Sequence, residues 1–304
     1  MRSLKLSGAQ IVLKTLKDLG VDTLFGYPGG AVIPLYDALY EVRDDFTHIR
    51  TSHEQGASHA ADGYARVTGK VGVCIATSGP GATNTVTGIA NAYMDSVPML
   101  IITGQVPTNL IGKDSFQEID ITGVTNPITK HNYLVKDIQE LEITLKKAHH
   151  IAKTGRPGPV LVDIPKDIFL TKIDYKEVDD SDFREFVQGK MKNVDCYDDE
   201  LIGTIVEKIN NAKKPVIYAG GGVIISNNCD KLNQLAKKGD IPVTNSLMGL
   251  GCISRKDRLS LGLLGMHGSR ESNLAVHNSD LVLAIGARFS DRVIGKADSF
   301  AKSA

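Results

Sequence analysis

The sequence predicts an α/β protein in which a parallel sheet with helices on both faces is followed by a second, incomplete Rossmann-like α/β domain. Three observations lead to this prediction. Short apolar runs alternate with segments of helical spacing along the chain. The runs are nearly continuous, as in strands that are buried on both faces. The alternation stops and then restarts, as expected for two domains in 304 residues.

The first alternation runs from Gly8 to Pro165. Its apolar runs predict five strands, at Val21–Tyr27, Thr47–Ser52, Val71–Thr77, Met99–Thr103 and Pro159–Ile164. Helical spacing predicts helices between them, at Ala9–Leu19, Ile33–Tyr40, Ala82–Met94 and Leu141–Ala152. Residues 1–170 are therefore expected to form the first domain.

An acidic segment separates the two alternations. Thr171–Glu200 holds ten acidic and five basic residues with little periodicity, which predicts a solvated linker at 171–197. The second alternation contains strands at Pro215–Ala219, Ile241–Asn245 and Asp280–Ile285, with helices at Asp199–Asn211, Cys229–Lys238 and Glu271–His277. Because three strands are few for such a sheet, residues 198–304 are expected to be the first part of a truncated middle domain.

The composition excludes several classes of function. The 35 basic and 35 acidic residues balance, so nothing indicates nucleic acid or an anionic membrane as a partner. No window approaches the roughly 18 apolar residues of a membrane span, and the start lacks the apolar core of a signal peptide. The four cysteines are widely spaced without a C-x-x-C, which fits a reducing compartment. We expect a cytoplasmic enzyme.

The ends of the first two strands carry candidate ligand-binding turns. In Gly26–Gly30 the glycines let backbone approach a ligand closely, although a tight turn that needs positive φ is the favoured explanation when the motif is taken alone. Glu54 follows the second strand, where Thr51-x-x-Glu54 reads as a capping box and Ser52-x-x-Gln55 as a second register. Cofactor binding and helix capping both remain open here.

The third strand ends in Thr77–Asn84, which resembles a phosphate cradle but lacks the spacing of a P-loop. Its polar residues Ser78, Thr83 and Asn84 are able to bind a ligand or to cap the next helix. Ligands of open α/β sheets bind outside the carboxyl ends of the strands. The three turns together therefore predict one site at that edge of the sheet.

In the second half, Gly220, Gly221 and Gly222 follow a strand, but Ile225 stands where a dinucleotide fingerprint needs glycine. The pattern still suggests a pyrophosphate passing close to backbone. Two further loops, at 264–269 and 286–293, carry histidine and arginine. Taken alone, His267 reads as a packing histidine, and Arg288 and Arg292 as solvated residues or as partners of Asp291.

Together these segments resemble the large catalytic subunit of the acetohydroxyacid synthase (acetolactate synthase) family of thiamine-diphosphate enzymes. The resemblance runs from about Leu6 to the last residue. It rests on the segments Phe25–Gly30, His53–Gln55, Thr77–Asn84, Ile102–Pro107, Ser115–Glu118, Thr129–Tyr133, Gly155–Val160 and the three glycine- or arginine-bearing loops of the second half. It implies a thiamine-diphosphate-binding fold whose first domain is of the pyrimidine type.

The resemblance also implies a chemistry. The motif glutamate, Glu54, would contact the pyrimidine nitrogen N1′ and promote loss of the thiazolium C2 proton. The carbanion would attack pyruvate, and after loss of CO₂ the adduct would add to a second 2-keto acid, giving 2-acetolactate or 2-aceto-2-hydroxybutyrate. Groups that exchange protons work best with a pKa near the working pH, and burial is what moves a carboxyl there. We therefore expect Glu54 to be substantially buried.

Other roles carry over as implied by the resemblance. Gly29 would let backbone lie against the reacting centre, with Pro28 beside it, and Ser78 and Asn84 would bind the same cofactor. Phe116, Gln117 and Lys130 would line the active-site entrance, and Arg292 would hold the carboxylate of the second substrate. Flavin adenine dinucleotide (FAD) would lie near Arg156, Gly220, Gly221, Gly222, Ser246, Leu247, Met266, His267, Gly286, Arg288 and Asp291.

The sequence departs from the family pattern in one respect. No Gly-Asp-Gly occurs, so the ligands of Mg²⁺ and the diphosphate group are expected in a C-terminal domain outside these residues, and no metal site is predicted within them. The family further implies a homodimer with a composite active site and a small regulatory subunit. We therefore expect these 304 residues alone not to catalyse carboligation.

Two other readings stay open. The chain is also compatible with a different thiamine-diphosphate enzyme, such as a pyruvate oxidase or a 2-keto-acid decarboxylase, although Ser115–Gln117 and Arg292 argue against this. A non-catalytic nucleotide-binding module is the reading of another class, and the missing diphosphate domain is its best support.

Overall fold

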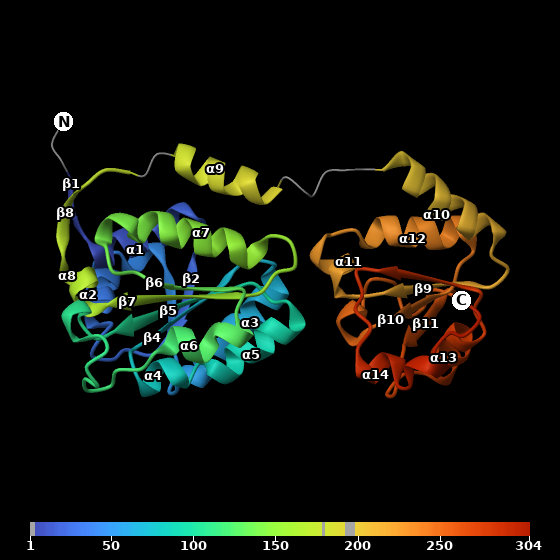
Figure 1. Cartoon of the computed structure of the whole chain (residues 1–304), viewed down its shortest axis with the longest axis horizontal. Helices are drawn as coiled ribbons and strands as arrows, with labels where there is room; N and C mark the ends of the chain where they lie inside the picture. Colours follow the sequence, from blue (N-terminus) through green and yellow to red (C-terminus); the bar gives the residue numbers. More distant parts are fainter. Residues whose placement is uncertain (1–3, 178–179, 192–197) are drawn as a thin grey trace. The chain divides into compact units, whose positions relative to one another are not determined.

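The computed structural model describes residues 4–177, 180–191 and 198–304. Two compact units divide the chain at Asn193–Val194, and each has its own parallel sheet (Figure 1). Single-turn 3-10 helices lie at Arg43–Asp45, Thr108–Leu110, Asn126–Ile128, Ile138–Glu140, Leu247–Gly249 and Ala297–Ser299. None of the helices in the described ranges is long and apolar enough to cross a membrane.

Unit 1 contains a six-stranded parallel sheet with the order β3-β2-β4-β5-β7-β6. The strands are β2 (Thr23–Gly26), β3 (Thr47–Arg50), β4 (Gly72–Ala76), β5 (Met99–Gln105), β6 (His131–Leu134) and β7 (Pro159–Pro165). The five strands predicted from apolar runs are confirmed, with ends shifted by a few residues. The sequence reading missed β6, because His-Asn-Tyr-Leu is too short and too polar to stand out as a strand.

Helices cover both faces of this sheet (Figure 1). One face packs against α1 (Gly8–Asp18), α2 (Ile33–Glu41), α7 (Leu141–Lys153) and α8 (Lys166–Leu170). The other packs against α3 (Glu54–Thr68), α4 (Pro80–Thr83), α5 (Val86–Asp95) and α6 (Ile121–Thr125). Val73 and Ile75 of β4 enter the first core and Cys74 enters the second. Burial on both faces explains the continuous apolar runs.

The predicted linker is partly structured. Lys172–Tyr175 forms β8, which pairs antiparallel with β1 (Leu4–Ser7), and Asp180–Met191 forms α9. The ring centroids of Phe183 and Phe186 on α9 lie 5.7 and 6.0 Å from that of His150 on α7. A few aromatic contacts therefore tie this acidic segment to unit 1, which charge counting could not reveal. Residues 178–179 and 192–197 of the predicted linker lie outside the described residues.

Unit 2 contains four parallel strands in the order β11-β10-β9-β12, one more than the sequence predicted. They are β9 (Pro215–Ala219), β10 (Val243–Asn245), β11 (Ser260–Leu263) and β12 (Leu281–Ile285). One face is covered by α10 (Asp199–Asn211), α11 (Gly221–Ile225) and α12 (Cys229–Gly239), the other by α13 (Arg270–His277) and α14 (Asp291–Ile294). The extra strand, β11, contains Gly262 at φ 88°. A glycine inside a short strand weakens the sequence pattern of that strand, so the sequence did not predict it.

Candidate active site

The three candidate turns of unit 1 meet at one edge of the sheet. β3, β2 and β4 are neighbours and run parallel, so the residues that follow them lie together at their carboxyl ends. Thr77, directly after β4, is the centre of this group. Its Oγ1 accepts a hydrogen bond from the backbone N–H of Ala31, which follows β2, at 3.1 Å.

Two glycines pack against the Thr77 side chain. An ideal Cβ on Gly29 would lie 2.5 Å from Thr77 Cγ2, and one on Gly81 would lie 2.6 Å from the same atom. Real Cβ atoms do not approach other atoms so closely. No such contact exists at Gly30, where an added Cβ would meet open space. The glycines at 29 and 81 are therefore required by packing, and the one at 30 is not.

Glu54 is the first residue of α3 and is only 8% exposed. The helix is capped by His53, whose side chain accepts from the Gln55 N–H at 3.1 Å. Thr51 Oγ1 instead donates to the His53 carbonyl at 2.8 Å. Neither of the two capping boxes expected from the sequence forms. Helix capping therefore does not explain why a glutamate is buried at this position.

One oxygen of the Glu54 carboxyl has a protein partner and the other does not. Asn84 Nδ2 donates to Oε2 at 3.0 Å. Within the described residues no hydrogen bond reaches Oε1, which an ideal Cβ on Gly81 would approach to 3.2 Å. Oε1 is not among the buried side-chain atoms that lack a partner in the described residues, so it is accessible and can accept a hydrogen bond from a ligand or water. The arrangement therefore suits a ligand that meets Glu54 between the glycine-bearing turns.

The charge of Glu54 also affects the residues behind it. Burial, followed by the charge of Glu54, raises the pKa of the Cys74 thiol to about 12. Burial also raises the pKa of Tyr36, with smaller contributions from Cys74 and Glu54. The Tyr36 hydroxyl lies 3.2 Å from His48 Nε2. The Cys74 thiol and the Tyr36 hydroxyl therefore keep their protons at ordinary pH.

The loop after β5 carries Phe116 and Gln117. Gln117 has φ 58°, and an ideal Cβ on Gly79 would lie 2.6 Å from its carbonyl oxygen, so this residue rests on the turn that follows β4. Phe116 is 87% exposed at the loop surface. The Glu118 carboxylate accepts from the N–H groups of Gly112 and Ser115, the latter at 2.9 Å. The loop is thus folded onto the site by its own backbone contacts.

A buried carboxyl that the sequence reading overlooked lies under this loop. Thr103 Oγ1 donates to Asp163 Oδ1 at 2.7 Å, and Gln105 Nε2 donates to Asp163 Oδ2 at 2.9 Å. The same Gln105 amide donates to the carbonyl of Ile119 at 2.8 Å. Burial raises the pKa of Asp163 to about 7. In the sequence, Asp163 is the only charged residue of the apolar run Pro159–Pro165, and this position could have indicated a buried carboxyl.

Lys130 and Arg156 are not brought to this edge of the sheet. Both precede strands of the sheet, so they lie at its amino edge. Lys130 Nζ donates to the carbonyls of Ile151 and, at 2.7 Å, of Thr154. Arg156 Nε donates to Ser96 Oγ at 2.7 Å, at the end of α5. Within unit 1 Lys130 therefore anchors the end of α7, and its expected place at the active-site entrance stays a prediction.

A lysine does follow a strand at the carboxyl edge. Lys166 begins α8, directly after β7, and its neighbour Asp167 accepts from Thr108 N at 3.0 Å. The sequence reading did not select Lys166, although its place after a strand end was the signal.

Pro28 is half-buried in the turn after β2, and Ser78 is 5% exposed in the turn after β4. Both therefore lie where the sequence placed them.

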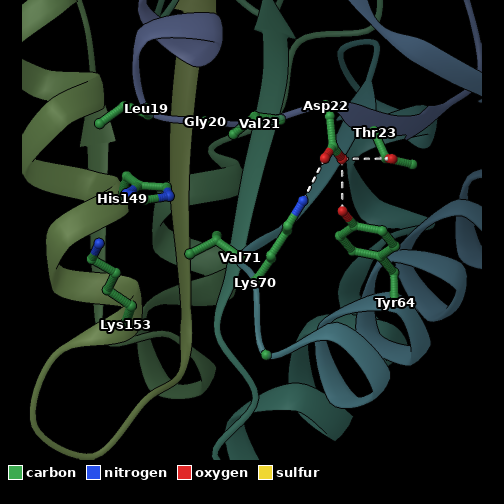
Figure 2. A pocket seen from close by; sticks show the side chains of 11 residues that line it. Leu19, Gly20, Val21, Asp22, Thr23, Tyr64, Lys70, Val71, His149 and Lys153 are labelled. Carbon is green, nitrogen blue, oxygen red and sulfur yellow. Dashed lines mark hydrogen bonds and ion pairs between the residues drawn. The ribbon is translucent and has the colours of Figure 1, made fainter.

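Figure 2 shows a cavity of about 240 Å³ that lies elsewhere. It is lined by the starts of β2 and β4 and by the ends of helices, where Asp22 accepts from Lys70 and from Tyr64 at 2.8 Å. Burial, followed by the charge of Lys153, lowers the pKa of His149 in its wall to about 4. This cavity is on the amino edge of the sheet, away from Glu54.

In unit 2 the glycine-bearing turns after β9 and β12 interlock. An ideal Cβ on Gly220 would lie 2.2 Å from the Gly286 carbonyl oxygen, and one on Gly222 would lie 2.7 Å from Gly286 Cα. The Gly222 N–H donates to the same carbonyl at 2.9 Å. An ideal Cβ on Gly221 would lie 2.9 Å from Met248 Cβ. Contact between two turns thus accounts for these glycines without a pyrophosphate.

Other predicted residues gather at the same edge of the second sheet. Arg292 Nη1 lies 3.7 Å from Met266 Sδ, and its Nε lies 3.6 Å from Asp291 Oδ2. The Tyr218 hydroxyl donates to the Arg288 carbonyl at 3.1 Å. His267 is exposed, so it is not the packing histidine that its sequence context suggested. Ser246 caps a 3-10 helix by accepting from Gly249 N at 3.1 Å, beside the 70%-exposed Leu247.

Comparison with known proteins matches one family domain to each of the two units. The N-terminal TPP binding domain of thiamine pyrophosphate enzymes matches residues 6–124, and their central domain matches residues 202–304. The acetolactate synthase large subunit of Parasynechococcus marenigrum is 49% identical over 301 residues, covering 98% of this chain and 48% of the relative. That of Haemophilus influenzae is 48% identical over 301 residues, covering 99% and 52%.

A third relative, the acetolactate synthase large subunit of Lactococcus lactis, is 45% identical over 308 residues, covering 100% of this chain and 52% of the relative. The chain spans about half the length of the curated relatives it matches. Similarity at this level over nearly the whole chain includes the Glu54 turn and both sheets. The chain belongs to the thiamine pyrophosphate enzymes and is a homologue of the large subunits of acetolactate synthase.

Proposed function

We propose that this chain provides the pyrimidine-binding and central parts of an acetolactate synthase that joins pyruvate to a second 2-keto acid, pyruvate or 2-ketobutyrate. The observation that carries the proposal is Glu54, a residue only 8% exposed whose Oε2 is held by Asn84 and whose Oε1 has no hydrogen-bond partner in the described structure. The relatives named above supply the reaction class. In the cell the reaction would supply carbon skeletons for branched-chain amino acids.

The residues around Glu54 fit thiamine diphosphate. A Cβ at Gly81 would lie 3.2 Å from Glu54 Oε1, so the absence of a side chain there leaves this oxygen uncovered on that side. Bound thiamine diphosphate would supply the carbon nucleophile that the reaction of a 2-keto acid needs. The part of Glu54 is to hold and return a proton at the ring nitrogen N1′. Its burial strengthens this contact by removing competing water.

The second cofactor and the substrate grip belong to unit 2 in this proposal. FAD would lie against the turns that hold Gly220, Gly286 and Arg288, and the proximity of Arg292 to Met266 supports a pocket wall there. The fixed charge and planar fork of Arg292 suit a substrate carboxylate. Phe116 and Gln117 would border the entrance from unit 1. Mg²⁺ would be held together with the diphosphate group by residues outside this chain.

Three further features follow from the family and are part of the proposal. The working enzyme would be a homodimer whose active site combines surfaces of two subunits, with a small regulatory subunit as a further partner. It would act in the cytoplasm. These expectations rest on the resemblance to acetolactate synthases.

The test uses the complete catalytic subunit that contains these residues. With pyruvate, Mg²⁺, FAD and thiamine diphosphate, the wild type should form 2-acetolactate. Glu54→Gln should reduce the rate at least about a hundredfold, because acid–base groups contribute on that order. His59→Gln, an exposed change on the same helix α3, should have no effect.

Each rival reading predicts a different product pattern. Acetaldehyde as the main product would favour a 2-keto-acid decarboxylase, and acetyl phosphate would favour a pyruvate oxidase. An undiminished rate in Glu54→Gln would favour a non-catalytic module and would overturn the proposal.

A further inference from the structure

The single protein contact to the Glu54 carboxylate within the described residues comes from Asn84. This residue ends α4, where its own N–H bonds to the carbonyl of Pro80 at 3.0 Å. The backbone bond fixes the Asn84 Cα, and from there Nδ2 reaches Glu54 Oε2 at 3.0 Å. The two residues are 30 positions apart in sequence. Their contact therefore ties the turn after β4 to the start of α3.

No other group of the described site is placed to donate to Glu54. The Gln55 N–H, which lies nearest along the helix, is taken by His53 Nδ1 at 3.1 Å. Tyr36 shares a hydrogen bond with His48 at 3.2 Å. Cys74 is a weak donor. The orientation of the carboxyl thus depends on the amide of Asn84.

We propose that Asn84 is a positioning residue that holds Oε2 of Glu54, so that Oε1 is the oxygen presented to the pyrimidine ring. This inference rests on the proposed function. It replaces the expectation that Asn84 binds the cofactor itself. An amide is suited to the task, because it donates a directed hydrogen bond without adding a charge that would compete with the ligand.

The assignment predicts that activation of the cofactor and affinity for the cofactor change separately. Glu54 acts on the ring, so its removal should abolish activation of the cofactor. Asn84 acts through Glu54, so its loss should slow activation while cofactor affinity changes little. A hydrogen bond to a charged group is typically worth roughly tenfold to a hundredfold in an equilibrium or rate. That is the size of the effect expected for Asn84.

The experiment follows exchange of the C2 proton of bound thiamine diphosphate for deuterium by NMR, together with the dissociation constant of the cofactor. It uses the complete subunit with Mg²⁺. Asn84→Ala should slow the exchange about ten- to hundredfold and change the dissociation constant less than about threefold. Thr87→Ala, an exposed change at the start of the following helix α5, is the control.

A shape-preserving variant covers the case in which Asn84→Ala does not fold. Asn84→Asp keeps the side-chain volume but replaces the donor by a second carboxylate, so it should slow exchange at least as much. Exchange at the wild-type rate in either folded variant overturns the inference. Slow exchange that is fully explained by weaker cofactor binding also overturns it, in favour of direct contact.

Glu54→Gln in the same assay keeps the two proposals distinguishable. Lost exchange in Glu54→Gln with normal exchange in Asn84→Ala contradicts only the role of Asn84. Normal exchange in Glu54→Gln contradicts the proposed function itself.

Discussion

Thr103 and Asp163 face each other on neighbouring strands, and the threonine hydroxyl donates to the buried carboxylate at 2.7 Å. Asp163 is 1% exposed, and its other oxygen is held by the amide that also anchors the loop of Gln117. The sheet therefore carries a titratable carboxyl group beneath the entrance loop, and burial raises the pKa of that group.

The stability of the chain should depend on the titration of Asp163. Burial raises its pKa from 3.8 to about 7, so between these pH values the folded chain binds more protons than the unfolded chain. The free energy of unfolding should therefore fall as pH rises through this window, by up to about 4 kcal/mol. Below pH 4 and above pH 7 this contribution should be constant.

Asp163→Asn removes that titration and leaves the other carboxyl groups in place. The difference between the free energies of unfolding of the wild type and the variant, measured by denaturation from pH 4 to pH 8, should change across the window. Parallel curves for the two proteins would show that Asp163 does not titrate in this range.

The glycines around Thr77 should differ sharply in their tolerance of a side chain. Gly29→Ala and Gly81→Ala each force a Cβ to within 2.6 Å of Thr77 or closer, so each should cost about 1–3 kcal/mol of stability. Gly30→Ala meets no atom within 4 Å and should change stability by less than about 0.5 kcal/mol. Equal effects at Gly29 and Gly30 in chemical denaturation would show that packing against Thr77 is not the constraint.

The entrance loop should depend on Glu118. Two backbone N–H groups, of Gly112 and Ser115, converge on its carboxylate, and they lower its pKa. Glu118→Ala should therefore accelerate hydrogen exchange of these two amides and cleavage of the loop by proteases. Lys113→Ala, an exposed change in the same loop, serves as the control. Unchanged protection in Glu118→Ala would mean that the loop holds its shape without this contact.

Lys130 should matter for stability and not for activation of the cofactor. Its ammonium group satisfies two carbonyls at the end of α7, so Lys130→Met should cost about 1–3 kcal/mol. Lys136→Met, at an exposed position nearby, should be close to neutral. C2 proton exchange of bound cofactor should remain at the wild-type rate in Lys130→Met. A selective loss of exchange in a stable variant would return Lys130 to the active site.

Periodicity and apolar runs were sufficient to predict most of the architecture. The strands of the first sheet are buried on both faces, so their sequences are distinctive, and the turns after them had to meet at one edge. β6 and β11 were not predicted, because they are short and carry polar residues or glycine. β8 and α9 were not predicted either, because their sequences are rich in charged residues and the few contacts that hold them leave no pattern in the sequence.

The site was predictable only in part, for a related reason. Glu54 stood out through its place after a strand and through the family motif. The Glu54 side chain does not cap α3, because His53 is the N-cap residue and its side chain accepts from the Gln55 N–H. Local sequence rules did not predict this role for His53. The glycines of unit 2 illustrate the opposite case, because a motif that suggests a ligand is already explained by contact between Gly222 and Gly286.

The most direct measurement is the exchange rate of the C2 proton of thiamine diphosphate bound to the complete subunit, compared between the wild type and Glu54→Gln. If Glu54 is the buried group that activates the cofactor, the variant should bind thiamine diphosphate and yet exchange the proton at least about a hundredfold more slowly. Exchange at the wild-type rate in a folded, cofactor-bound Glu54→Gln variant would contradict the account.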